Sequence, residues 1–186
     1  MSCQRSRGRT TRLGRAASAK IVLVATRRPR DAPSASPVFG FTSYFGEVSH
    51  LFDATATDLS RFAARGGRII WLHGHDDPSV SPLENRRNVE AIIARMGQDQ
   101  ADRFLRYFEV PGLAHGGGRF APQWESLAAL DAWVEHGTPP DGAIVTDGTQ
   151  TETRGRTRPL CRFPTWPKFT GTGDARLAAS FTCVAE

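Results

Sequence analysis

The sequence lacks any long apolar run and contains few cysteines. Its longest purely apolar stretch is Ile21–Ala25, whereas a helix that crosses a bilayer needs about 20 apolar residues, which excludes a membrane-spanning helix. The 186 residues include only three cysteines. A chain of this length buries roughly 70% of the surface that it exposes when unfolded, so folding requires neither a metal nor a disulfide.

Positive charge is scarce outside the first part of the chain. The net charge is +5, but residues 1–31 hold nine bases and one acid, which leaves 15 bases and 18 acids in residues 32–186. The acidic balance of this larger part argues against a nucleic-acid-binding surface. The Arg-rich start has an apolar run shorter than the about seven to fifteen residues of a signal peptide, so no signal peptide is recognised. We expect residues 1–36 to be a disordered basic leader.

The elements are best defined where glycine and proline interrupt strong apolar patterns. Residues 37–52 are rich in aromatics without a clean period, which predicts irregular or edge structure. The helix that follows Ser81 has the clearest signals, because Ser81 with Glu84 predicts a capping box and Pro82 suits the first helical position. The pattern predicts, in order, a short helix near 58–65, a strand at 68–73, a helix at 82–96, a strand at 104–110, a helix at 122–136 and a further strand at 143–146.

This alternation of helices and strands with short connections predicts an α/β fold. Right-handed crossovers then give a parallel sheet flanked by helices. We expect three regions: the leader at 1–36, the folded part at 37–148, and an irregular, Pro-rich tail at 149–186.

Two loops with titratable groups follow the two predicted strands directly. They are HGHDDP at 73–78 and PGLAHGGG at 111–118. Because ligands of parallel sheets bind at the carboxyl ends of the strands, a carboxylate on the first loop can face an imidazole on the second. Asp77 and His115 suit the acid and base of a nucleophilic triad, in which the carboxylate fixes the tautomer of the histidine.

Six ordered motifs in this chain resemble those of the tannase and feruloyl esterase family of α/β-hydrolases. The likeness covers roughly residues 58–184, and the motifs are DLSRFAARGGRII, HGHDDP, VPGLAHGGG, ALDAWVEHG, RPLCRFP and SFTCV. The resemblance therefore implies a partial α/β-hydrolase sheet and a serine carboxylesterase that acts on small aromatic acid esters. It also implies an extracellular or periplasmic location.

The resemblance assigns roles to individual residues. Asp77 is similar to the family's triad acid and His115 to its base, while Cys161 and Cys183 match the family's disulfide near the C-terminus. Cys3 is then expected to be unpaired. No cofactor or metal is expected, because the calcium of the family belongs to a lid that this sequence lacks.

Two departures from the family bear on activity. No serine before Asp77 has the glycines at positions ±2 that a G-x-S-x-G nucleophile elbow requires. Gly116 stands where the family has a cysteine bonded to a cysteine beside the nucleophile. The chain is therefore interpreted as the C-terminal portion of such an esterase, with acid and base but no nucleophile, and is expected to be inactive alone.

Two other functions are consistent with parts of the sequence. His73, His75 and Asp77 form an H-x-H-x-D pattern, with His115 as a third imidazole, which is typical of metal-dependent hydrolases. The basic leader could also bind an acidic partner or nucleic acid, in which case the folded part is a non-enzymatic interaction domain.

Overall fold

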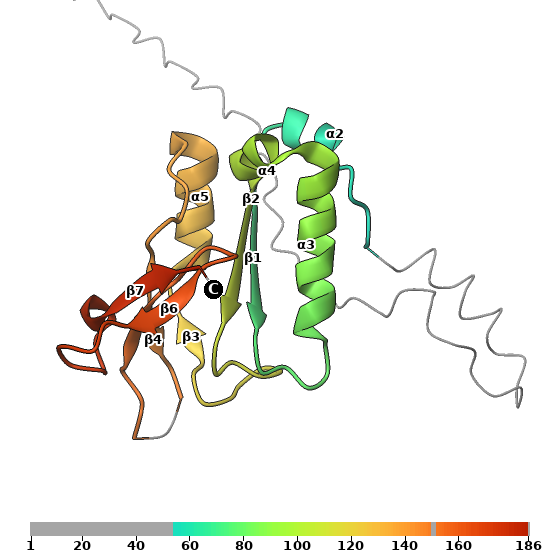
Figure 1. The fold of residues 1–186 in the computed structure, drawn as a ribbon. Coiled ribbons are helices and arrows are strands. Elements are labelled where there is room, and N and C mark those ends of the chain that lie inside the picture. Colours follow the sequence, from blue (N-terminus) through green and yellow to red (C-terminus); the bar gives the residue numbers. More distant parts are fainter. Residues whose placement is uncertain (1–53, 150–151, 186) are drawn as a thin grey trace, which may run out of the picture.

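A two-stranded parallel sheet forms the centre of the protein. The computed structural model describes residues 54–149 and 152–185. Strand β1 (Ile69–Gly74) pairs with β2 (Leu105–Val110) in parallel, in a register that runs from Ile69 opposite Leu105 to Gly74 opposite Val110. Both strands lie within one residue of their predicted limits, and Figure 1 shows them side by side. The predicted leader at 1–36, the segment at 37–52 and Cys3 lie outside the described residues.

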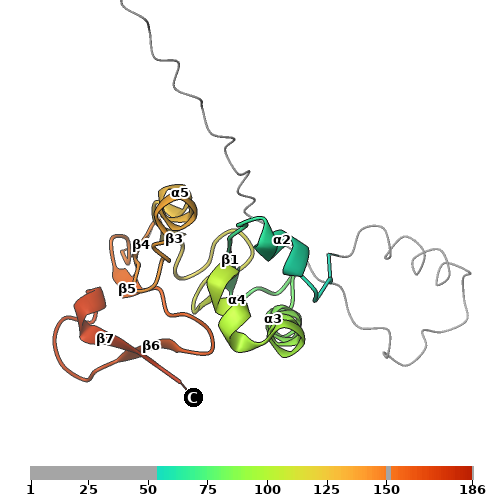
Figure 2. The same cartoon turned by 90° about the horizontal axis from the view of Figure 1, so that it is seen from above.

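Helices cover both faces of this sheet, as Figure 2 shows. Helices α3 (Pro82–Met96) and α4 (Gln98–Phe104) lie on one face, and α5 (Ser126–His136) lies on the other. Neighbouring strand residues point to opposite faces. Ile70 accordingly packs into the core beneath α5, with Leu130 and Trp133, while Trp71 packs into the core beneath α3 and α4. The short helix α2 (Ser60–Ala64) packs Phe62 against this second core.

The predicted strand at 143–146 does not join the parallel sheet, which corrects that part of the prediction. Strand β4 (Ile144–Asp147) lies between β3 (Pro122–Gln123) and β5 (Thr157–Pro159) in a separate antiparallel sheet. The tail is also more regular than predicted. Strands β6 (Trp166–Phe169) and β7 (Phe181–Val184) form an antiparallel pair, with the 3-10 helix η1 (Ala178–Ser180) just before β7.

The structure also corrects three details of the predicted helices. Helix α4 was not predicted, and its last residue, Phe104, belongs to this helix rather than to the strand that follows. The helix predicted at 122–136 begins only at Ser126, since its first two residues form β3. The capping box is absent: Ser81 is the N-cap residue of α3 but makes no side-chain cap hydrogen bond, and Glu84 pairs with Arg87 at 2.6 Å instead.

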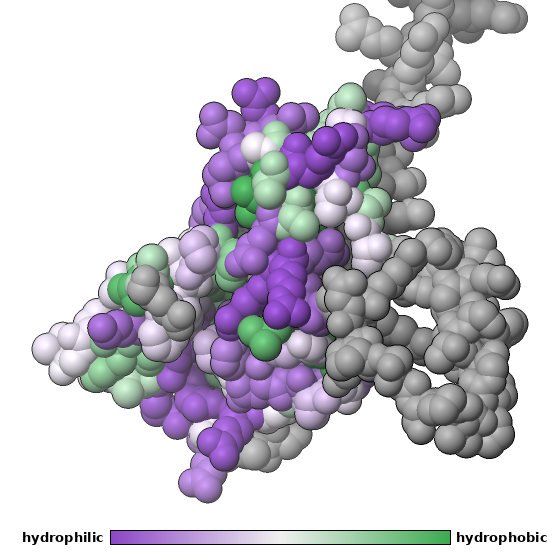
Figure 3. All heavy atoms as spheres, turned by 45° about the vertical axis from the view of Figure 1, so that its right-hand side comes forward, coloured by the Kyte–Doolittle hydropathy of each residue, from purple (hydrophilic) through white to green (hydrophobic). Residues whose placement is uncertain are grey.

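The disulfide that the resemblance implied is present. Cys161 and Cys183 are bonded with 5.5 Å between their Cα atoms, and the bond joins β7 to the segment that follows β5. The face of the molecule in Figure 3 is mostly hydrophilic, with hydrophobic residues gathered in small patches. None of the helices in the described ranges has the length and apolar character needed to traverse a membrane.

Candidate functional site

The loops after β1 and β2 are joined to each other at the carboxyl edge of the sheet. The backbone N–H of His75 donates to the carbonyl of Val110 and that of Asp76 to the carbonyl of Leu113, each at 3.0 Å. A Cβ at Gly74 would stand 2.3 Å from the Leu113 carbonyl oxygen, so only glycine permits this close approach. The two loops predicted to face each other are therefore in direct backbone contact.

The second loop folds back on itself and presents His115 at its tip. The N–H of Ala114 donates to the carbonyl of Gly117 at 2.7 Å, and the N–H of Phe120 donates to that of Gly112 at 3.0 Å. Gly118 has a φ of +121°, and a Cβ there would stand 2.3 Å from the Gly112 carbonyl oxygen. The glycines thus allow the tight return of the chain, and the His115 side chain stays 63% exposed.

Asp77 and His115 are hydrogen-bonded. Oδ2 of Asp77 lies 3.1 Å from Nδ1 of His115, while Oδ1 of Asp77 accepts the N–H groups of Ser79 at 2.8 Å and Val80 at 3.0 Å. The Asp77 side chain is only 6% exposed. Both carboxylate oxygens therefore have partners, and the buried acid is fixed before any substrate arrives.

The electrostatics of this pair favour an ionised acid. Burial acts to raise the pKa of Asp77, but hydrogen bonds from the backbone N–H groups of Val80 and Ser79 and from His115 outweigh it and lower the pKa below its usual value. An ionised carboxylate cannot donate, so Nδ1 of His115 is the donor of this hydrogen bond. Nε2 of His115 has no hydrogen-bond partner within the described residues.

A second imidazole–carboxylate pair, which the sequence analysis missed, lies at the same edge. Nδ1 of His75 lies 2.5 Å from Oε1 of Glu109, and Arg86 of α3 binds both Glu109 oxygens, at 2.5 and 2.6 Å. Burial acts to raise the pKa of Glu109, but the bonds from Arg86 and His75 outweigh it and lower the pKa. A charged residue near the end of a buried strand was the available signal for this cluster.

The residues of the metal-site alternative do not converge. Nε2 of His73 bonds to the carbonyl of Val80 at 3.2 Å, His75 pairs with Glu109, and Asp77 pairs with His115. Across residues 54–149 and 152–185, no three or more His, Cys, Asp or Glu side chains gather in a way that could hold a metal ion. The metal-dependent alternative therefore has no geometric support among these residues.

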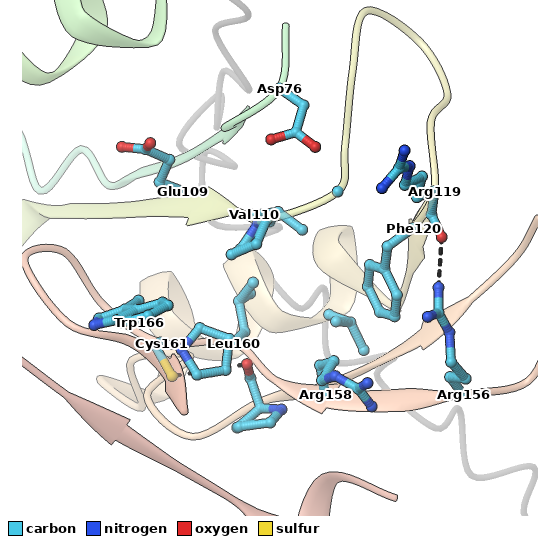
Figure 4. A pocket seen from close by; sticks show the side chains of 15 residues that line it. Asp76, Glu109, Val110, Arg119, Phe120, Arg156, Arg158, Leu160, Cys161 and Trp166 are labelled. Atoms are coloured by element: carbon cyan, nitrogen blue, oxygen red, sulfur yellow. Dashed lines mark hydrogen bonds between the residues drawn. The ribbon is translucent and has the colours of Figure 1, made fainter. Parts of the chain in front are cut away.

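A pocket of about 340 Å³ opens beside the two loops, and Figure 4 shows it from close by. Asp76 and Glu109 line it from the carboxyl edge of the parallel sheet. Arg156 and Arg158 line it from β5 and the segment before it. Neither Asp77 nor His115 lines this pocket. The sequence analysis did not single out any of the arginines.

Comparison with known proteins gives the same family as the motifs. The profile described as "Tannase and feruloyl esterase" matches residues 41–184. An uncharacterized esterase of Agrobacterium fabrum is 58% identical over 140 residues, which are 75% of this chain and 25% of the relative. Mono(2-hydroxyethyl) terephthalate hydrolase of Piscinibacter sakaiensis is 39% identical over 135 residues, which are 71% and 22% of the two chains.

Solved structures agree with this assignment. Tannin acyl hydrolase from Aspergillus niger superposes with a TM-score of 0.65 at 26% identity, over 77% of this chain and 27% of its own. Feruloyl esterase B from Aspergillus oryzae gives a TM-score of 0.66 at 22% identity, over 75% and 31% of the two chains, which shows the shared fold. The chain thus spans about a quarter of the length of the relatives it matches. It belongs to the tannase and feruloyl esterase family.

Proposed function

We propose that this chain supplies the acid and base of a serine-type carboxylic ester hydrolase that acts on small aromatic esters. The observation that carries the proposal is the hydrogen bond between buried Asp77 and exposed His115, at 3.1 Å, on adjoining loops of a parallel sheet. The family membership supports an ester as substrate. The Cys161–Cys183 disulfide supports an oxidising compartment, either extracellular or periplasmic.

In the proposed reaction the proton moves through one nitrogen. Nε2 of His115 takes the proton of a serine hydroxyl as that oxygen forms a bond to the ester carbonyl carbon. Asp77 stabilises the resulting imidazolium through Nδ1. The proton then passes from Nε2 to the alcohol oxygen as the ester bond breaks, and a water repeats the cycle on the acyl-enzyme.

The serine itself is not found in this sequence. No serine of the 186 residues has glycines at both positions two residues away. The oxyanion hole of such hydrolases lies partly at that elbow. We therefore expect the chain alone to hydrolyse neither methyl ferulate nor methyl gallate, and to remain unlabelled by a fluorophosphonate probe. Labelling of a serine in this chain would contradict that expectation.

A chimera tests the role of the pair. The 140 matched residues of the Agrobacterium esterase are replaced by their counterparts from this chain, and hydrolysis of p-nitrophenyl acetate and methyl ferulate is measured. We expect an active chimera in which His115→Ala lowers kcat by about 10⁴-fold. His136→Ala, at the exposed end of α5, is the matched control and should leave kcat unchanged. An active chimera that tolerates His115→Ala would refute the proposal.

A further inference from the structure

The pocket in Figure 4 combines an apolar floor with an aromatic rim. Its floor is made by four buried side chains from three parts of the fold, namely Val110, Phe120, Val145 and Leu160. Trp166 lies at the edge and remains 42% exposed, although large aromatic side chains are usually covered. At about 340 Å³, the cavity has the size of a site for one small ring compound.

Arg158 has uncommitted hydrogen-bond donors at this pocket. Its guanidinium lies 3.9 Å from the centre of the Phe181 ring, and one Nη donates to the carbonyl of Thr157 at 2.7 Å. No carboxylate pairs with it among the residues that the structure describes, whereas the neighbouring Arg156 is paired with Asp147 at 2.7 Å. Burial and the nearby Arg156 charge lower the pKa of Arg158, and they outweigh the opposing effect of the Asp147 carboxylate. An anion in the pocket would relieve that cost.

The other side of the pocket offers an acceptor. Asp76 is exposed and lies across Val110 from Arg158 in Figure 4, and within the described ranges its carboxylate has no partner. Glu109 also lines the pocket, but its charge is balanced by Arg86. The pocket thus has Arg158, which lacks a paired carboxylate within the described residues, at one end, the Asp76 carboxylate at the other, and apolar surface between them, and Arg119 and Arg156 also line it.

We propose that this pocket binds a small aromatic carboxylate that carries a hydroxyl group. Arg158 takes the carboxylate, the ring lies between Phe120 and Trp166, and the hydroxyl donates to Asp76. Guanidinium groups bind carboxylates through paired hydrogen bonds, which gives this end its selectivity. The site is distinct from the Asp77–His115 pair. Its use as a product site, for the acid released from an aromatic ester, rests on the proposed function, but binding itself does not.

The experiment measures the binding of 4-hydroxycinnamate to the full chain by isothermal titration calorimetry. We expect saturable one-to-one binding that Arg158→Gln weakens about tenfold or more, because a charge-assisted bond is lost. Arg103→Gln removes the same charge from an exposed position of α4 and should leave the Kd unchanged. The neutral methyl ester should bind about tenfold more weakly than the acid, and Asp76→Asn should weaken binding of 4-hydroxycinnamate but not of cinnamate.

The location of the ligand is read from the indole N–H signal of Trp166 in NMR spectra. A shift of this signal supports the site, while a shift confined to His115 would overturn it. Equal affinities of the acid and its methyl ester would also overturn it. Arg158→Lys, which keeps the charge, is the second variant if Arg158→Gln does not fold, and it should retain part of the affinity. If this chain binds 4-hydroxycinnamate but the chimera is inactive, the result supports the binding site and contradicts its role as a product site.

Discussion

Two imidazole–carboxylate pairs lie at the same sheet edge, and we expect only one of them to act as a base. In the Asp77–His115 pair the carboxylate is held by backbone N–H groups, so its negative charge acts on the imidazole. In the His75–Glu109 pair the carboxylate charge is already balanced by the Arg86 guanidinium. We therefore expect the partner of the carboxylate, rather than the presence of a histidine beside it, to distinguish a proton-transfer pair from a structural one.

The strongest test of this difference is substitution of one residue from each pair, Asp77 and His75, in the active chimera. Asp77→Asn should lower kcat by about 10⁴-fold, because the amide no longer fixes Nδ1–H and cannot stabilise the imidazolium. His75→Ala should change kcat by less than about threefold, since ion pairs of exposed side chains contribute little. Steady-state hydrolysis of p-nitrophenyl acetate measures both. Similar losses for the two variants would erase the distinction.

Removal of the cation should expose the structural role of the second pair. Arg86→Met leaves the Glu109 carboxylate, 10% exposed, without its cation. We expect the free energy of unfolding to fall by about 2 kcal/mol, less than the roughly 3–5 kcal/mol seen for fully buried pairs, because Arg86 itself is 31% exposed. Urea denaturation of the chain measures the change.

The control for this variant lies one residue away. Arg87 pairs with Glu84 on the exposed side of α3, so Arg87→Met should cost less than about 0.5 kcal/mol. Adding Glu109→Gln to Arg86→Met should recover part of the lost stability, because the unpaired charge is removed. No recovery would mean that Arg86 stabilises the fold by packing rather than by charge.

The smallest expected effect is on the acid dependence of stability. The pKa values of Asp77 and Glu109 are both lowered in the folded state, so each stabilises the protein above the unfolded value of about 4. That stability is lost as the pH falls through the lowered values. Asp77→Asn and Glu109→Gln should each flatten the decline, by less than the about 1.4 kcal/mol per pH unit that one proton gives. Urea midpoints between pH 2 and 6 provide the measurement, and an unchanged slope in both variants would contradict it.

The parts of this fold that were predictable are those in which local signals and burial agree. Strand β1 is a short apolar run bounded by glycines, β2 ends at Pro111-Gly112, and α3 has both its proline and its terminal Gly97 in place. Helix α4 was missed because its sequence, QDQADRF, is polar and ends in a residue that suits a strand equally well. The tail strands were missed because proline and glycine obscure their alternation, and pairing between distant segments stabilises them.

The candidate site shows the same limit. The placement of Asp77 and His115 together followed from strand order, since parallel strands end at one edge. The contacts of Glu109 with Arg86 and of Arg158 with Phe181 depend on which side chains meet across α3, β2, β5 and β7, which no local pattern records. The Ser81–Glu84 motif was present but was not used, because Arg87 offered Glu84 a stronger partner one turn along the helix.

Gly74 places a constraint on this edge that a survey of reactive groups would overlook. It carries no functional atom, yet a single added methyl would collide with the Leu113 carbonyl and push the two loops apart. Mutational tolerance here should therefore be as low as at the ionisable positions, for a purely steric reason. In a saturation library, depletion of alanine at residue 74 would report on the spacing of the two loops rather than on proton transfer.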